Sequence, residues 1–191
     1  GQLGYDLPSG SKSSWIPLPV DINGSGDPYD EGQLSNLAMG ESFSGVVANN
    51  GTAEMNIYTW GNNSYGQLGN GTLIGHTKPT PILFESPSQN ILTVETLDFN
   101  EFSSAMIFND GDLNFLYTWG SNWYGGAGIG TESYNPKSPE QVGITELNVN
   151  AFSNNGRSME IALTNPFGGA DLLYGWGYND VNQLGLNSKE I

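Results

Sequence analysis

The sequence predicts an all-β protein built from tandem repeats, and three observations support this prediction. A glycine-rich motif around one tryptophan recurs three times along the 191 residues. Short apolar stretches and turn-forming dipeptides precede each copy, which is typical of antiparallel strands joined by hairpins. Helical spacing of apolar residues is absent, and the high content of glycine and asparagine opposes helix formation.

The recurring motif sets the length of the repeat. Its tryptophans, Trp60, Trp119 and Trp176, lie 59 and 57 residues apart, and each stands nine residues before a closing glycine. The closing glycines are Gly69, Gly128 and Gly185. We therefore expect one repeat domain over residues 1–191. Residues 1–4 match the tail of a preceding repeat, and the units that follow are 5–69, 70–128 and 129–185.

Two strands are expected in the first half of each unit. One lies in a proline-containing segment, which suits an edge strand because proline has no N–H to donate to a ladder. These segments are 17–20, 79–82 and 138–142. The next strand holds two apolar residues three positions apart, in segments 34–37, 94–97 and 144–147.

A hairpin is expected in the second half of each unit. A bulky apolar residue stands 17 positions before each tryptophan and predicts a buried apolar slot; these residues are Phe43, Phe102 and Met159. In the third unit Phe152 competes for this slot, and Met159 is preferred because it keeps the spacing. Dipeptides that favour positive φ angles, at 50–51, 110–111 and 168–169, then lead into the tryptophan strand.

Four short strands per unit, with an aromatic motif and several glycines, indicate the blade of a β-propeller. The motif Trp-Gly-x-Asn-x-x-Gly-Gln-Leu-Gly and the Asn-Gly-Thr that follows it, at residues 60–72, resemble the repeat of the regulator of chromosome condensation superfamily. The resemblance implies a seven-bladed propeller. Because 191 residues hold only about three such repeats, we expect a fragment of a longer ring or an array completed by other chains.

The recurring tryptophans and glycines are expected to be structural. Repeat proteins reuse one packing solution in every unit, so Trp60, Trp119 and Trp176 are predicted to form the core of each repeat rather than a surface for ligand stacking. The glycines after each tryptophan and at each motif end are predicted to permit turns and close strand approach. They are Gly61, Gly120, Gly177, Gly69, Gly128 and Gly185.

Aromatic residues in the variable part of the motif loops are candidates for a binding rim. Tyr65 lies in the first loop, and Trp123 and Tyr124 lie in the second. Tyrosine and tryptophan are enriched among interface hot spots, which favours a surface for a protein or a glycan. The alternative is that these rings pack on neighbouring loops.

An acidic segment near the N-terminus resembles the first half of a calcium loop. Oxygen-bearing side chains and a glycine follow the order that such loops use, and the candidate ligands are Asp21, Asn23, Ser25 and Asp27. The twelfth position is Gly32 instead of a bidentate glutamate, so a solvated acidic loop is the alternative interpretation. No other cofactor is expected.

Charge and composition exclude several function classes. The chain has 20 acidic and 5 basic residues and a net charge of −15, which opposes binding to nucleic acid or anionic lipid. Cysteine is absent, which excludes disulfides and thiolate sites, and no apolar run is long enough for membrane insertion. His76 is the only histidine, so no catalytic residue and no enzymatic activity are predicted.

These observations predict non-enzymatic binding to a protein partner. The style of the repeats and the many Asn, Gly, Ser and Thr residues favour a part of a large extracellular, cell-surface or virion protein. One alternative, implied by the resemblance, is guanine-nucleotide exchange on a small GTPase. Neither a basic chromatin-binding face nor a dedicated interaction loop is recognisable for that activity. Glycan adhesion through the aromatic loops is the other alternative.

Overall fold

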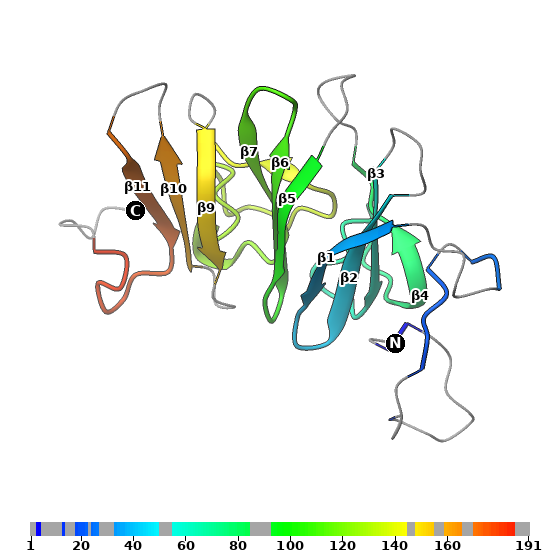
Figure 1. Cartoon of the computed structure of the whole chain (residues 1–191). Helices are drawn as coiled ribbons and strands as arrows, with labels where there is room; N and C mark the ends of the chain where they lie inside the picture. The colour runs from blue at the N-terminus through cyan, green and yellow to red at the C-terminus, as the bar shows by residue number, and fades with distance from the viewer. Residues whose placement is uncertain are drawn as a thin grey trace.

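The chain, described by a computed structural model, is all-β and forms three antiparallel sheets that lie side by side in chain order (Figure 1). The structure describes residues 3–4, 13, 18–22, 24–26, 33–49, 55–84, 93–144, 148–154, 159–165 and 170–185. The strand orders are β1-β2-β3-β4, β5-β6-β7-β8 and, within these residues, β11-β10-β9. The prediction of an all-β fold with about three blades is confirmed.

The strands of each sheet are short and of similar length. In the first sheet they are β1 (Gln33–Met39), β2 (Phe43–Asn49), β3 (Met55–Gly61) and β4 (His76–Pro81). In the second they are β5 (Thr93–Phe99), β6 (Ser103–Asn109), β7 (Asn114–Gly120) and β8 (Glu140–Gln141). In the third they are β9 (Asn148–Asn154), β10 (Met159–Asn165) and β11 (Leu172–Gly177).

The proline-containing strand closes the preceding sheet. β4 carries Pro79 and Pro81 and pairs only with β3, where Tyr58 lies opposite Pro81. Proline is tolerated there because β4 is an edge strand of its sheet. Each four-stranded sheet thus takes its outer strand from the segment after the closing glycine, so the sheets and the sequence units are offset by one strand.

The hairpin register corrects one residue of the predicted apolar slot. Phe43 lies opposite Gly61 and Met159 lies opposite Gly177, so the two residues hold the same place. In the second sheet Ser103 lies opposite Gly120, and the prediction of Phe102 in this slot is wrong. The β6–β7 hairpin loop is one residue shorter than the β2–β3 loop, which moves Phe102 out of the strand to a half-buried position.

The strand predicted over 144–147 falls mostly outside the described residues. Ile144 lies outside any strand, residues 145–147 are not among those described, and the first strand of the third sheet is β9. Val149 is fully buried there and, with Phe152, repeats the apolar spacing of Val94 and Leu97 in β5. The hydrophobic pair that fixes the register therefore lies further along the chain than the sequence pattern suggested.

The packing between sheets repeats one contact. The fully buried indole of Trp119 reaches back to the motif loop of the first sheet, where its Nε1 donates a hydrogen bond to the Gln67 carbonyl at 2.9 Å. Trp176 donates in the same way to the Gly126 carbonyl at 2.9 Å. The tryptophan of each of these two sheets thereby covers the loop that closes the sheet before it.

The closing glycine is required at this contact. Gly69 has a φ of +66°, and a Cβ built on it would lie 2.8 Å from Trp119 Nε1. Gly128 has a φ of +65°, and its Cβ would lie 2.7 Å from Trp176 Nε1. Both the left-handed backbone and the close approach of the indole exclude a side chain. The six predicted structural glycines all have positive φ, and they are Gly61, Gly120, Gly177, Gly69, Gly128 and Gly185.

We predict that Trp119→Ala lowers the free energy of unfolding by about 3–5 kcal/mol, because it removes a buried aromatic ring and leaves a cavity. Trp123→Ala is the matched control, since Trp123 is 47% exposed. Its loss should stay below about 1.5 kcal/mol, the scale of an aromatic pair. Urea denaturation of both variants measures the difference, and equal losses would contradict the assigned packing.

A second prediction separates backbone strain from the tryptophan contact. Gly185→Ala should cost about 1–2 kcal/mol through its φ of +66° alone, because a Cβ there meets nothing within 4 Å. Gly69→Ala has the same backbone cost and also drives a methyl group into Trp119, so its loss should be larger by about 1–3 kcal/mol. Thermal and urea unfolding test this, and a Gly69 variant as stable as the Gly185 variant would refute the contact.

Candidate functional site

The motif loops leave the three sheets at the same end. Each loop follows the glycine that pairs with the start of β2, β6 or β10. Backbone bonds fix the exits of the first two, since Asn62 N donates to Ser42 O and Ser121 N donates to Phe102 O, both at 2.9 Å. Side chains on these loops are therefore displayed together along one end of the molecule.

An asparagine three residues after each tryptophan holds its loop. The Oδ1 atoms of Asn63, Asn122 and Asn179 accept hydrogen bonds from the amides of Leu68, Ala127 and Leu184 at 2.9, 3.0 and 3.0 Å. Asn63 and Asn122 are 1% exposed. Sequence reasoning missed these residues as structural, although their fixed position after every tryptophan was a usable signal.

The amide nitrogens of two of these asparagines hold the loop that follows. Asn63 Nδ2 donates to the carbonyls of Thr72 and Ile74 at 3.0 and 3.1 Å. Asn122 Nδ2 donates to the carbonyls of Thr131 and Tyr134 at 2.6 and 3.0 Å. Each buried amide group is therefore satisfied on both its oxygen and its nitrogen, and each stabilises a loop without regular structure.

The aromatic residues of the loops form a surface group across the first two sheets. The centroid of the Tyr65 ring lies 5.2 Å from that of Trp123 and 4.9 Å from that of Phe102. The centroids of the Phe102 and Trp123 rings are 5.8 Å apart. Tyr65 and Phe102 are half-buried, whereas Trp123 is 47% exposed. The structure thus brings Tyr65 and Trp123 together and adds Phe102, displaced from the core by the shorter hairpin.

Tyr124 extends the group towards the third sheet. Tyr124 lies in a 3-10 turn, η1 (Trp123–Gly125), and has a φ of +57°. The centroid of its ring lies 4.6 Å from that of the Tyr178 ring. Tyr124 is 56% exposed. Trp123 therefore contacts a ring of the preceding motif and Tyr124 a ring of the following one. We call this set the aromatic rim: Tyr65, Phe102, Trp123, Tyr124 and Tyr178.

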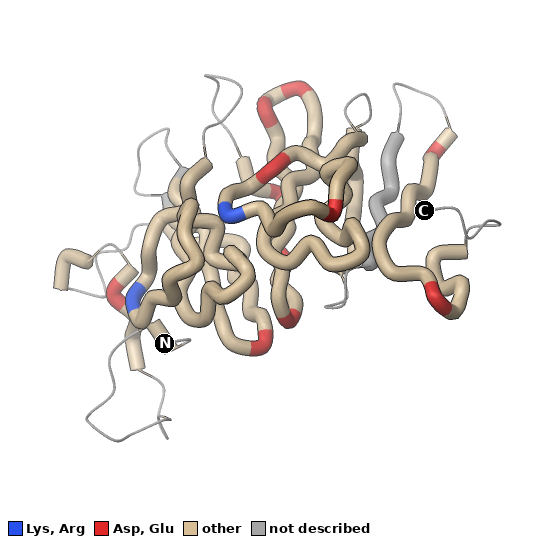
Figure 2. Tube along the Cα trace, turned by 180° about the vertical axis from the view of Figure 1, so that it is seen from behind, with Lys and Arg blue, Asp and Glu red and all other residues tan. Residues whose placement is uncertain are grey.

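Acidic residues outnumber basic residues along the described part of the chain (Figure 2). Glu101 directly precedes Phe102, and Asp180 accepts a hydrogen bond from the Tyr178 hydroxyl at 2.6 Å. Of the five basic residues in the chain, Lys78 and Lys137 lie in the described part. Lys137 lies beside Gly66 of the first motif loop, so the preference for a positively charged partner comes from the net charge of −15.

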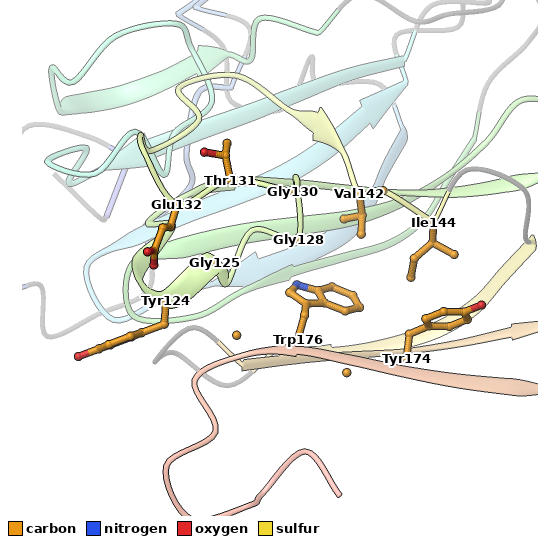
Figure 3. Close-up of a pocket in the computed structure, with 13 residues that line it drawn as sticks. Tyr124, Gly125, Gly128, Gly130, Thr131, Glu132, Val142, Ile144, Tyr174 and Trp176 are labelled. Atoms are coloured by element: carbon orange, nitrogen blue, oxygen red, sulfur yellow. The ribbon is translucent and has the colours of Figure 1, made fainter. Parts of the chain in front are cut away.

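A pocket of about 530 Å³ opens beside Tyr124, between the second and third sheets (Figure 3). Trp176 and Tyr174 rise from β11 on one side, and Val142 and Ile144 face them from the segment after β8. Glu132 stands at the opposite end, near Tyr124. Glycines form much of the remaining wall, so backbone lines the space where side chains would otherwise fill it.

The candidate calcium loop is described only in part. Asp21 Oδ1 accepts a hydrogen bond from Gly24 N and Asp21 Oδ2 accepts one from Gly26 N, both at 2.8 Å. Ser25 lies between these two amides and is exposed, while Asn23 and Asp27 lie outside the described residues. Among the described residues, no three His, Cys, Asp or Glu side chains gather as a metal site.

Asp98 and Tyr134 are two of the described groups whose pKa is raised. Burial raises the pKa of Asp98 in β5 above its usual range, although a hydrogen bond from the Phe99 backbone opposes the shift. The pKa of Tyr134 is raised because its hydroxyl donates a hydrogen bond to Glu140 at 2.7 Å. Neither group lines the pocket or belongs to the aromatic rim.

Asn63→Ala should lower the free energy of unfolding by about 1–3 kcal/mol, because the buried amide of Leu68 loses its acceptor. Its neighbour Asn62 is exposed, and its side chain accepts hydrogen bonds from Ser64 within the same turn, so Asn62→Ala serves as the control. The control should change stability by less than about 0.5 kcal/mol. Amide hydrogen exchange at Leu68 should accelerate in the Asn63 variant alone, and equal exchange in both variants would contradict this role.

One family model matches part of this chain, and related proteins match all of it. Residues 56–96 match the model of the regulator of chromosome condensation (RCC1) repeat. The chain is 28% identical over 193 residues to the ultraviolet-B receptor UVR8 of Arabidopsis thaliana and 26% identical over 197 residues to the probable E3 ubiquitin-protein ligase HERC6 of Homo sapiens. Both matches cover 100% of this chain, which spans 38% of the first protein and 16% of the second.

This chain matches about a third of the length of each solved structure of similar fold. Yeast RCC1 (Prp20), solved bound to Kap60, matches 80% of this chain with a TM-score of 0.62 and 17% identity, over 34% of its length. Human WBSCR16 matches 78% with a TM-score of 0.60 and 21% identity, also over 34% of its length. The chain therefore carries repeats of the RCC1 type, folded as a partial propeller.

No helix in the described part of the chain has the length and apolar character needed to cross a membrane.

Proposed function

We propose that this set of RCC1-type repeats is a protein-interaction module and that the aromatic rim is its contact surface. One observation carries the proposal: five aromatic side chains from three sheets gather at one end, where Trp123 is 47% and Tyr124 56% exposed. The rings make contact in two groups, and Trp123 of one group and Tyr124 of the other are adjacent in the chain. Exposed apolar groups gathered in this way mark interaction sites. Tyrosine and tryptophan are also the residues that supply most binding energy at interfaces.

The surroundings of the rim favour tight binding to a positively charged protein. The buried asparagines hold the loops in one conformation, so little conformational entropy is lost when a partner docks. With a net charge of −15, the chain attracts a basic partner over long range and accelerates its association. Such a module needs no catalytic group, in keeping with a fold known for regulators.

Two other activities remain candidates for the same surface. A crystal structure of the related Prp20p of Saccharomyces cerevisiae is described together with its binding to Gsp1p and histones, which supports protein partners and leaves nucleotide exchange as a second candidate. Glycan binding by the exposed rings is the third. The many Asn, Gly, Ser and Thr residues support placement in a large extracellular, cell-surface or virion protein.

Association with a further blade would also fit the end of the third sheet. Leu172 and Leu173 of β11 are 42% and 69% exposed, and Gly185 presents the closing-glycine conformation without a contact like that of Trp119 on Gly69. A blade from the same or another chain would bring a tryptophan to this position. This proposal extends to Gly185 the packing that joins the described sheets.

A photo-crosslinking amino acid at position 123 should capture one dominant protein partner. The control places it at Ile74, which is 68% exposed on the loop after the first motif but lies outside the rim. Once the partner is identified by mass spectrometry, Trp123→Ala should weaken its binding about 30-fold or more, as expected for a hot spot. An unchanged dissociation constant, measured by calorimetry, would overturn the rim as the contact surface.

Two assays distinguish the remaining candidates. A panel of small GTPases loaded with fluorescent GDP should release nucleotide at the same rate with and without the chain. Accelerated release would establish exchange activity instead of simple binding. A glycan array should remain unlabelled, and saturable binding that is lost in Trp123→Ala would assign the rim to a carbohydrate.

A further inference from the structure

The pocket between the second and third sheets exists because two residues of the repeat are replaced. Equivalent backbone bonds define the comparison: Leu83 N donates to Gly69 O at 2.7 Å, and Gly143 N donates to Gly128 O at 3.1 Å. Gly143 therefore stands where the preceding repeat has Leu83, and Ile144 stands where it has Phe84. Both replacements put a smaller side chain at the position.

In the preceding repeat this space is filled by the chain itself. The ring of Phe84 packs edge-on against Tyr117 and Phe108 of the second sheet, with centroids 5.0 and 5.2 Å apart. Leu83 covers the neighbouring turn, where its Cδ2 lies 3.1 Å from the Cβ position of Gly71. As a result, Tyr117 is only 6% exposed.

The corresponding surfaces of the next repeat are uncovered. Tyr174 holds the place of Tyr117, lines the pocket and is 39% exposed. Gly130 holds the place of Gly71, and a Cβ built on it meets nothing within 4 Å. The pocket volume of about 530 Å³ falls in the range of small-ligand sites, about 300–1,000 Å³.

We propose that this pocket receives an aromatic side chain of a partner protein, which takes the place that Phe84 holds in the preceding repeat. The inference rests on the proposed function and adds the chemistry of the partner. Trp176, Tyr174 and Ile144 supply the faces for the ring, and aromatic pairs of this kind prefer edge-on or offset contacts.

The mouth of the pocket selects the residue next to that ring. Glu132 is exposed and has Thr131 beside it, at the end of the pocket that adjoins Tyr124 of the aromatic rim (Figure 3). A lysine or arginine beside the aromatic residue would pair with Glu132, in accord with the net charge of −15. Because Tyr124 belongs to both sites, one peptide segment spans the pocket and the rim.

The probe is the capped tripeptide Lys-Phe-Lys, titrated into the full chain with Lys-Ala-Lys as the control. The indole N–H signal of Trp176 in a nitrogen–proton NMR spectrum should shift saturably with the phenylalanine peptide alone, whereas that of the buried Trp119 stays in place. Affinity in the millimolar range, about −4 kcal/mol, is expected for a single side chain. No shift of the Trp176 signal up to about 10 mM peptide would overturn the proposal.

Filling the pocket is the sharper test. The double variant Gly143→Leu/Ile144→Phe restores the residues of the preceding repeat, and Gly143 tolerates it because its φ is not positive and its Cβ would meet only Gly128 O, at 3.7 Å. Peptide binding should fall about tenfold or more without loss of thermal stability. Ile74→Phe adds an aromatic ring on the exposed loop outside the pocket and should bind like the parent chain.

Two further outcomes bear on the assignment. Glu132→Gln should weaken binding of the lysine peptide and reduce its salt dependence, and an unchanged salt dependence would contradict the role of Glu132. Phenethylamine bound as tightly as the peptide would overturn the assignment to a protein side chain in favour of a small-molecule site. Failure of these titrations leaves crosslinking at position 123 unaffected, since that experiment requires no occupant of the pocket.

Discussion

The indole of one sheet, held over the closing glycine of the sheet before it, is the contact on which the rest of this structure depends. Trp119 donates to the Gln67 carbonyl while its ring covers Gly69, and the same arrangement joins Trp176 to the loop of the second sheet. The contact joins residues at least 50 positions apart in the chain, so it connects neighbouring blades rather than strands within one blade. Its repetition gives each sheet a fixed place beside the last, as expected for a repeat protein whose stability lies in nearest-neighbour interfaces.

That fixed spacing also positions the candidate sites. The motif loop must pass beneath the next tryptophan, and the buried asparagine holds it there, so the variable residues at the loop tip are displayed at regular intervals. In this chain the tips carry Tyr65, Trp123 and Tyr124, whose rings lie close enough to touch rings of adjacent motifs. A contact that serves stability thus arranges a surface suited to binding. The pocket beside it arises from the same repetition, because smaller residues occupy positions that the preceding repeat fills.

The sequence was sufficient to predict features that recur within one hairpin. The tryptophans, the closing glycines and the edge position of the proline strand all follow from local spacing and from the conformational limits of glycine and proline. Features set by tertiary pairing were not predictable in this way. Phe102 left its expected slot because one hairpin loop is a residue shorter, and β9 buries Val149, a residue that the sequence pattern did not single out. The pocket needed the alignment of Gly143 with Leu83, which only the hydrogen-bond pattern reveals.

Hydrogen exchange at the tryptophan indole nitrogens tests the central contact most directly. Because Trp119 is fully buried and bonded to the first motif loop, its indole N–H should exchange only through global unfolding and should slow as overall stability rises. The indole of Trp123, 47% exposed on the aromatic rim, provides the fast reference in the same spectrum. Protection of Trp119 equal to the global free energy of unfolding is the predicted result. Exchange of Trp119 as fast as that of Trp123 would contradict the account, since the sheets would then not be held together by this contact.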